Sequence, residues 1–415
     1  MSTSASLNLD SPRLDVISSA HYVANGYPFR EWAWLRRHDP VHWTEHPDYE
    51  PFWSITKHAD ITGLSTQPRA FLNAPRLAAF NKNVPPPPEQ TSRHLLNMDP
   101  PDHGRYRNVS SKQFTPRAVR ALEEKVERIT REVLDAAAAK GGGDFVRDVS
   151  APITIAVIAE MLGVPASDRA LLFRWTNEVI APEDPEYQRE GSAEKTIEGA
   201  RIELFQYFDA MSRERRRQPR EDIVSVVANG RVEGKPLDPV ELLSYYLLLV
   251  VAGNETTRNA MTGGVLAFLE NPGEWRKLTR DAALVEPAVE EVVRWITPVI
   301  QFCRTAVRDT TLRGKTIRAG QSCCLFYASA NRDEEVFEDP EVFRIDRIPN
   351  RHIGFGVGEH VCLGAHLARL ELRTVFAMLR ERLEHAELAG PVERALSSFV
   401  GGIKRAPMRW EMREA

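Results

Sequence analysis

The sequence predicts a mainly α fold of the α+β class, with one small β region late in the chain. Helical periodicity dominates from Pro116 to about residue 298, short strands and turns replace it between Val299 and Pro349, and helix returns after Cys362. We find no internal repeat and no long linker, so residues 1–415 are expected to form a single domain, of which residues 1–20 can be a flexible N-terminal segment.

The composition narrows the class of protein. Lys and Arg total 54 against 58 Asp and Glu, so the chain has no net positive charge. Its overall charge therefore does not favour binding to nucleic acid or to an anionic membrane. The N-terminus MSTSASLNLDSPRLDV lacks the basic start and apolar stretch of a signal peptide or membrane anchor. The four cysteines do not form a disulfide framework. We therefore expect a reduced, cytoplasmic protein with a small-molecule or protein partner.

The first hundred residues mix short helical pieces with strand-like runs such as PFWSITKH. The prolines at Pro85–Pro88 predict a surface loop. A helix is expected over Pro116–Leu134, and the glycines at Gly141–Gly143 predict a turn after it.

The middle of the chain is expected to be helical, with two interruptions. APEDPEYQ predicts an acidic loop, and RERRRQPRED predicts a solvated charged loop. Further on, Cys323 and Cys324 are adjacent on an apolar run that predicts a strand.

The segment from Leu242 to Ala252 is apolar on every side except at Ser244, which indicates a helix buried all round. A membrane span needs about 18 such residues, and the polar run NETTRN ends this stretch sooner. The polar residues Asn254–Thr257 would be costly inside a core unless they are paired. The alternative is that the helix reaches the surface there.

The stretch GFGVGEHVCLGAH places Cys362 just before a stretch whose apolar residues share one helical face. A thiol at a helix start meets free N–H groups and the positive end of the dipole, which favours a thiolate. The surrounding glycines allow a tight loop that a flat group can approach. A lone cysteine is otherwise a small buried hydrophobe. One thiolate cannot build a structural zinc site, but it suffices as an axial haem ligand.

The residues Phe355, Gly358, Cys362 and Gly364 reproduce the F-x-x-G-x-x-x-C-x-G signature, and the chain resembles the cytochrome P-450 family from about residue 20 to its end. The resemblance implies the single-domain cytochrome P-450 fold, with haem b between the central helix and the cysteine loop. It also implies that Cys362 is the axial ligand of the haem iron, with haem contacts from Ala252, Gly253, Phe355, Gly356 and Gly364.

The segment AGNETT is similar to the oxygen-activating helix of that family. A threonine in mid-helix can bond back to the carbonyl four residues earlier. The resemblance implies that Glu255 and Thr256 are the catalytic acid and alcohol that deliver protons to bound O2. Gly253 is expected to leave room for oxygen above the iron.

In EEVVR, Glu291 and Arg294 lie three residues apart and can pair on one helical face. Alone, this spacing fits a surface salt bridge equally well. The resemblance implies a structural role in which both join Arg347 of FRIDR and hold the thiolate loop. Arg344 stands where relatives often carry aspartate, which leaves the local bonding there open.

Two haem propionates need counter-charges. The resemblance implies that His103 and Arg107 of DPPDHGRYR supply them together with Arg304 of FCRTA and His360 beside the cysteine. Each residue taken alone also fits a plain surface position.

The implied activity is a monooxygenase that inserts one oxygen atom from O2 into a C–H bond of a hydrophobic small molecule, which is steroid-, terpenoid- or fatty-acid-like. Electrons are expected from NAD(P)H through a ferredoxin reductase and a ferredoxin, because no flavin or iron–sulfur module is recognisable. Lys112, Arg369 and Arg373 form a candidate basic docking patch, although helix faces are normally charged. The expected substrate pocket comprises residues 72–96, Leu248, Leu249, Ala252, Val299, Ile300, Phe302, Phe399 and Val400.

Two other functions fit the same residues. One is a peroxide-driven or reductive haem enzyme on this fold, against which the intact Glu255 and Thr256 argue. The other is a non-catalytic docking helper, which has no need of Cys362.

Overall fold

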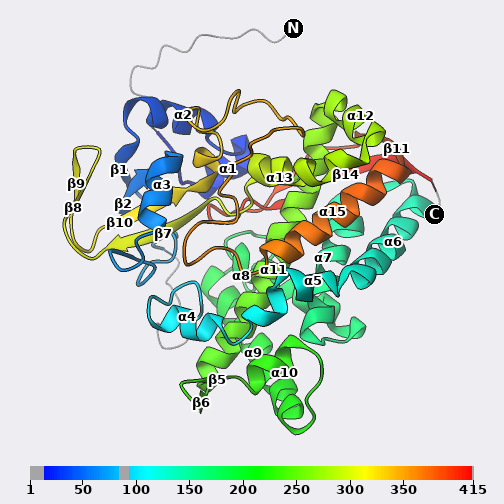
Figure 1. Ribbon diagram of the computed structural model, residues 1–415, viewed down its shortest axis with the longest axis horizontal. Coiled ribbons are helices and arrows are strands. Elements are labelled where there is room, and N and C mark those ends of the chain that lie inside the picture. The colour runs from blue at the N-terminus through cyan, green and yellow to red at the C-terminus, as the bar shows by residue number, and fades with distance from the viewer. Residues whose placement is uncertain (1–13, 84–92, 414–415) are drawn as a thin grey trace.

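Long helices gather around one central helix, α11 (Pro239–Glu270), in the computed structural model, which describes residues 14–83 and 93–413 (Figure 1). The other long helices are α6 (Glu123–Lys140), α7 (Ala151–Leu162), α8 (Arg169–Ile180), α9 (Ala193–Arg217), α13 (Val285–Ile296) and α15 (Ala365–Arg382). Shorter helices are α1 (Ser19–Asn25), α2 (Phe29–His38), α3 (His58–Ser65), α4 (Asp102–Arg107), α5 (Pro116–Arg120), α10 (Ile223–Ala228), α12 (Pro272–Arg280) and α14 (Tyr327–Ala330). The predicted mainly helical fold is confirmed.

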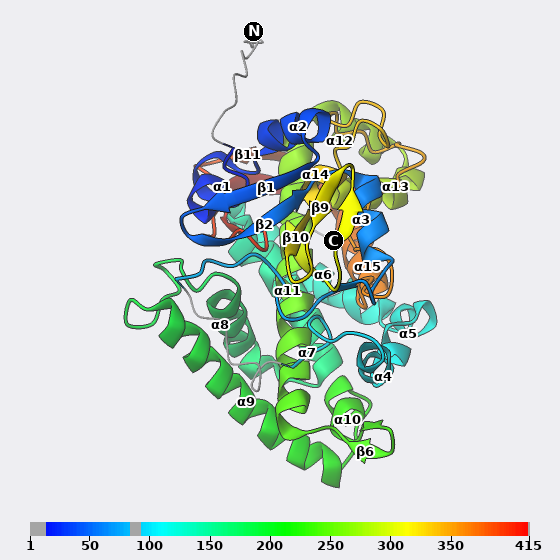
Figure 2. The ribbon, with the colours of Figure 1, turned by 90° about the vertical axis from the view of Figure 1, so that its left-hand side faces the viewer.

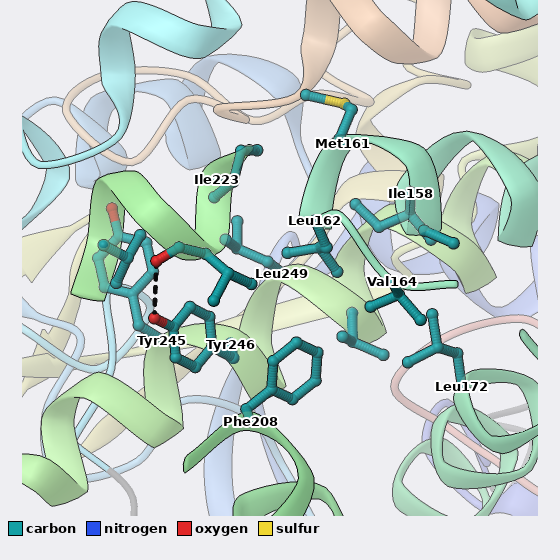
Figure 3. Packing of buried hydrophobic residues seen from close by; sticks show 14 of the residues in the cluster. Ile158, Met161, Leu162, Val164, Leu172, Phe208, Ile223, Tyr245, Tyr246 and Leu249 are labelled. Carbon is teal, nitrogen blue, oxygen red and sulfur yellow. Dashed lines mark hydrogen bonds between the residues drawn. The ribbon is translucent and has the colours of Figure 1, made fainter. Parts of the chain in front are cut away.

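The central helix begins at a strong cap. The Asp238 carboxylate accepts a hydrogen bond from the Val240 N–H at 2.9 Å, and Pro239 occupies the first turn, where its missing N–H costs nothing. Residues of α7, α9 and α11 then converge in one apolar cluster, in which the Phe208 and Tyr246 rings stack with their centroids 5.0 Å apart (Figure 3). As predicted, α11 is a core helix.

The β structure is small and comes from both ends of the chain. A five-stranded sheet has the order β1 (Val41–His46), β2 (Tyr49–Ile55), β10 (Ser322–Phe326), β7 (Gln301–Ala306) and β3 (Phe71–Leu72). A three-stranded sheet has the order β11 (Leu383–Leu388), β14 (Pro407–Met412) and β4 (Gly142–Asp144). Three two-stranded pairs complete it: β5 (Arg231–Val232) with β6 (Lys235–Pro236), β8 (Thr310–Leu312) with β9 (Lys315–Ile317), and β12 (Glu393–Arg394) with β13 (Ile403–Arg405).

The cysteine-bearing strand lies where the sequence predicts it. Cys323 and Cys324 are both in β10, which pairs with β2 in parallel and with β7 in antiparallel orientation. Cys324 lies opposite Cys303 of β7, and all three thiols are buried and unoxidised.

Three expectations need correction. Only the second half of RERRRQPRED is the expected loop: residues 213–217 form the end of α9, where the buried Arg215 pairs with Asp222 at 2.6 Å. The glycine run at Gly141 does end α6, with φ +67°, but Gly142 continues into strand β4. Residues 14–20 are not a flexible tail, since Val16 and Ile17 pack in the core; residues 1–13 and the prolines at 85–88 lie outside the described residues.

Within the described ranges, no helix combines the length and the apolar character that crossing a membrane requires.

Candidate active site

A cavity separates α11 from the loop that carries Cys362 and from the start of α15. In Figure 2, α11 crosses the middle of the molecule between the sheet and the α8–α9 layer. Of the residues predicted to contact haem, all line this cavity: Ala252, Gly253, His103, Arg107, Arg304, Phe355, Gly356, His360, Cys362 and Gly364. The fold therefore gathers into one space residues that are far apart in the chain.

The loop before α15 presents the Cys362 side chain to the cavity. The Cys362 N–H donates to the Phe355 carbonyl at 2.8 Å, which closes the loop on itself. Gly358 has φ +81°, and a side chain there would place its Cβ 2.6 Å from the Ser65 carbonyl oxygen. Only glycine fits such a position, which explains why the loop carries a glycine at residue 358.

The polypeptide alone does not lower the pKa of the Cys362 thiol, as the expected preference for a thiolate would require. Burial raises the pKa of Cys362 above its ordinary value, while the Gly364 N–H, Arg107 and Arg369 lower it less. Protein atoms surround the sulfur, yet the Cys362 residue is exposed, so this rise in pKa applies only while no other group contacts the sulfur. A metal ion bound to the sulfur would supply the missing stabilisation, because coordination deprotonates a thiol outright.

Four cationic or histidine side chains meet at one edge of the cavity. The His103 and His360 rings stack at 3.8 Å between centroids. Arg107 donates to the Val361 carbonyl at 2.7 Å, and Arg304 donates to the Cys303 carbonyl at 2.8 Å. Burial, His103, Arg304 and Arg107 together lower the pKa of His360 to about 2.

This edge fits the carboxylates of a haem. Arg107 and Arg304 bring two fixed positive charges to this edge, and an anion bound here would accept charge-assisted hydrogen bonds from them. The Glu359 carboxylate bonds to His103 at 3.3 Å. The thiol of Cys362 and the apolar walls of the same cavity fit the iron and the porphyrin. The residues present therefore fit a haem, and Cys362 is the thiol that could bind its iron.

The polar segment of α11 is buried rather than at the surface. Thr256 Oγ1 donates to the Ala252 carbonyl at 2.9 Å, which is the backward bond predicted from the sequence. Asn254 accepts from Thr154 of α7 at 2.8 Å and donates to Thr176 of α8 at 2.8 Å. Glu255 is 2% exposed and lines the cavity.

Sequence reasoning missed the partner of Glu255, which is Arg258 one turn along the same helix. Arg258 is also buried and donates to Asn177 of α8 at 3.1 Å. Burial raises the pKa of Glu255, and Arg258 and Thr176 oppose that rise. The i,i+3 spacing of the two charges was the available signal.

Gly253 has a packing role that the sequence did not predict. A side chain at this position would place its Cβ 2.8 Å from Ile158 Cδ1 of α7. The glycine thus permits the close approach of α7 to α11, although its backbone does line the cavity.

The triad of Glu291, Arg294 and Arg347 is assembled and buried. Arg294 donates to both Glu291 oxygens at 2.7 Å, and Arg347 donates at 3.2 Å. The open question at Arg344 has a simple answer: its backbone N–H donates to Glu291 at 2.9 Å, while its guanidinium lies outward near Asp346. An aspartate is therefore not required for this contact.

The apolar part of the cavity includes most of the predicted pocket residues, with two differences. Of residues 72–96, Asn73, Leu77, Leu95 and Leu96 line the cavity, and residues 84–92 lie outside the described residues. Lining residues are Leu77, Leu95, Leu96, Leu248, Leu249, Ala252, Val299, Phe302, Phe399 and Val400. Ile300 is fully buried instead in the cluster around Trp32 and Phe326 on the sheet, because its side chain points away from the cavity. Ile158 and Ile180 also line the cavity, and no local pattern distinguishes them from ordinary core.

The candidate docking cations are less available than expected. Arg369 is paired with Glu290 at 2.7 Å and Arg373 with Glu286 at 2.9 Å, whereas Lys112 is exposed.

The similarity to known proteins extends over nearly the whole chain. The family model for Cytochrome P450 matches residues 43–400. A steroid C26-monooxygenase of Mycolicibacterium smegmatis is 40% identical over 392 residues, which are 91% of this chain and 89% of the relative. Cytochrome P450-terp of a Pseudomonas species is 34% identical, over 95% of this chain and 96% of the relative.

Solved structures agree with this similarity. A Mycobacterium marinum cytochrome P450 in complex with pseudoionone superposes with a TM-score of 0.89 at 34% identity, over 95% of this chain and 98% of that one. A Bacillus megaterium relative in complex with testosterone gives 0.84 at 33% identity, over 94% and 99%. With the cysteine loop, the cationic edge and the acid–alcohol helix in place, the chain belongs to the cytochrome P450 family and is a haem-dependent monooxygenase of hydrophobic substrates.

Proposed function

We propose that Cys362 binds the iron of haem b and that the chain hydroxylates a C–H bond of a steroid-, terpenoid- or fatty-acid-like molecule. The observation that carries this proposal is the convergence of one thiol, four cationic or histidine side chains and an apolar pocket on a single cavity. His103, Arg107, Arg304 and His360 would hold the propionates. The haem supplies the oxygen chemistry, and its thiolate ligand favours O–O cleavage.

The protein residues would orient the substrate and move protons. Leu248, Val299 and Phe399 present an apolar surface that excludes water from the reacting C–H bond. Thr256 Oγ1 is fixed by its bond to the Ala252 carbonyl, and Glu255 lies beside it in the buried network with Arg258. This pair is suited to pass protons from the interior of α11 to the cavity.

The substrate class is supported by the relatives. One is named for oxidation of a steroid, and another was solved with testosterone. A further relative is named a methyl-branched lipid omega-hydroxylase. The lining of this cavity offers shape and apolar contact to the same kind of molecule.

Electrons would come from NAD(P)H through a ferredoxin reductase and a ferredoxin. Lys112 is exposed on the segment after α4, where an acidic donor protein could contact it. A cytoplasmic location is part of the same proposal.

The test is spectroscopic. The purified chain, reduced under carbon monoxide, is expected to give the thiolate-type Soret band, and Cys362→Ser is expected to lose that band and all turnover. Retention of the band in Cys362→Ser would refute the ligand assignment. Spin-state titration with a steroid, a terpenoid and a fatty acid would then identify the substrate class, and turnover with peroxide alone would favour the peroxide-driven alternative.

A further inference from the structure

Glu290, the residue before Glu291, joins three parts of the fold on the outer side of the cysteine loop. Its carboxylate accepts hydrogen bonds from Arg369 of α15 at 2.7 and 2.8 Å. It also bonds to His352 Nε2 at 3.0 Å. One carboxylate of α13 thus links α15 to the segment that leads into Phe355.

The hydrogen bonds of His352 define its tautomer. Its Nδ1 accepts the Gly354 N–H at 3.2 Å, so the ring proton is on Nε2 and is donated to Glu290. The side chain is 3% exposed. His352 therefore ties the backbone at the start of the cysteine loop to a fixed carboxylate.

Arg369 carries the connection on to the cysteine. Its guanidinium lies 4.4 Å from the centroid of the Phe355 ring, a cation–π contact. The Phe355 carbonyl accepts the Cys362 N–H at 2.8 Å. Both ends of the Phe355 residue are thus restrained, its ring by Arg369 and its carbonyl by the cysteine.

The carboxylate is charged across the working pH range. Burial raises the pKa of Glu290, but the hydrogen bonds from Arg369 and His352 outweigh it and lower the pKa to about 2. Bidentate pairing with an arginine is strong and directional. The arrangement has the geometry of a brace rather than that of a loose surface pair.

We propose that Glu290, His352 and Arg369 are positioning residues that brace Phe355 and the Cys362 amide, and so keep the sulfur oriented toward the haem iron. This inference rests on the proposed function, because it takes Cys362 as the iron ligand. It gives Arg369 a structural role on the outer side of the cysteine loop, in addition to the docking role expected from the sequence.

The chain provides a matched control. One turn away on the same two helices, Glu286 pairs with Arg373 at 2.9 Å, with side chains 76% and 41% exposed. Among the described contacts this pair joins α13 to α15 without reaching the cysteine loop. Glu286→Gln thus removes the same charge and the same type of interhelical bond.

The experiment compares Glu290→Gln with Glu286→Gln in the full-length, haem-loaded protein, without ferredoxin. The reduced carbon monoxide complex of Glu290→Gln is expected to convert from the thiolate-type to the thiol-type band at least about fivefold faster than wild type, since charge-assisted hydrogen bonds are lost. Glu286→Gln is expected to match wild type. Arg369→Lys, which keeps the charge but not the planar fork, is expected to be intermediate.

A second readout separates this inference from the proposed function. Amide hydrogen exchange over residues 353–362 in the haem-free chain is expected to speed up in Glu290→Gln alone. Equal conversion and equal exchange in wild type and Glu290→Gln would overturn the brace, as would a variant whose sole change is tighter ferredoxin binding. Absence of a thiolate band in wild type would instead remove the proposed function, while the exchange experiment still tests the brace.

Discussion

Arg347→Met is expected to destabilise the protein far more than Arg344→Met, although the two arginines are three residues apart. Arg347 is 2% exposed and donates to Glu291 at 3.2 Å and to the carbonyls of Asp339 and Val342 at 3.1 and 2.9 Å. The Arg344 guanidinium is 34% exposed, and its nearest carboxylate oxygens lie at 3.7 and 3.8 Å.

The expected losses in the free energy of unfolding follow from this difference in burial and pairing between the two arginines. Removing one partner of a buried ion pair costs about 3–5 kcal/mol. Arg294 still neutralises Glu291 in the variant, so we expect the lower end, about 3 kcal/mol. An exposed pair is worth about 0–1 kcal/mol. With 415 residues and about 2.1 cal/mol/K of unfolding entropy per residue, the Arg347 variant should melt about 3 °C lower.

The assay is urea unfolding of the haem-loaded protein, followed by tryptophan fluorescence and by Soret absorbance. The midpoint should fall clearly in Arg347→Met and little in Arg344→Met. Equal losses in the two variants would refute the reasoning, because Arg344 bonds Glu291 through its backbone N–H, which Arg344→Met keeps, and its guanidinium has only two long, partly exposed ion pairs.

Two further predictions concern the relay in α11. Thr256→Ala should oxidise NADH faster than it forms product, because the hydroxyl held at the Ala252 carbonyl is lost; equal coupling in wild type and variant would contradict the relay. In Arg258→Met the pKa of Glu255, already raised by burial, should rise further, because Arg258 is what lowers it. The Glu255 carboxyl then stays protonated to higher pH, so the pH dependence of the ratio of product formed to NADH oxidised should shift to higher pH. An unchanged pH profile would show that Arg258 does not control the protonation of Glu255.

Much of the site could be predicted because its signals are local. The residues from Phe355 to Gly364 are contiguous, and their glycines and thiol describe one loop and one ligand. The spacings of Glu291 with Arg294 and of Thr256 with Ala252 are one helical turn, so the sequence alone brings these groups together.

The features that the sequence could not show depend on neighbours far along the chain. In the sequence, Arg369 fits a free surface cation, whereas in the fold α13 places Glu290 beside it. The pKa of Cys362 depends on how much protein surrounds the sulfur, which no local pattern reports. Ile300 sits one residue from a lining position, but the direction of its side chain is set by the sheet.

The parallel pairing of β2 with β10 constrains the order in which the protein folds. Trp53 cannot pair with Cys323 until the 270 residues that follow Trp53 have been synthesised, and Cys362 is synthesised later still. Such long-range pairing folds slowly, and until it forms β2 keeps an unpaired edge. The prosthetic group can therefore be enclosed only after residue 362 has been synthesised, so the nascent chain must avoid aggregation until then.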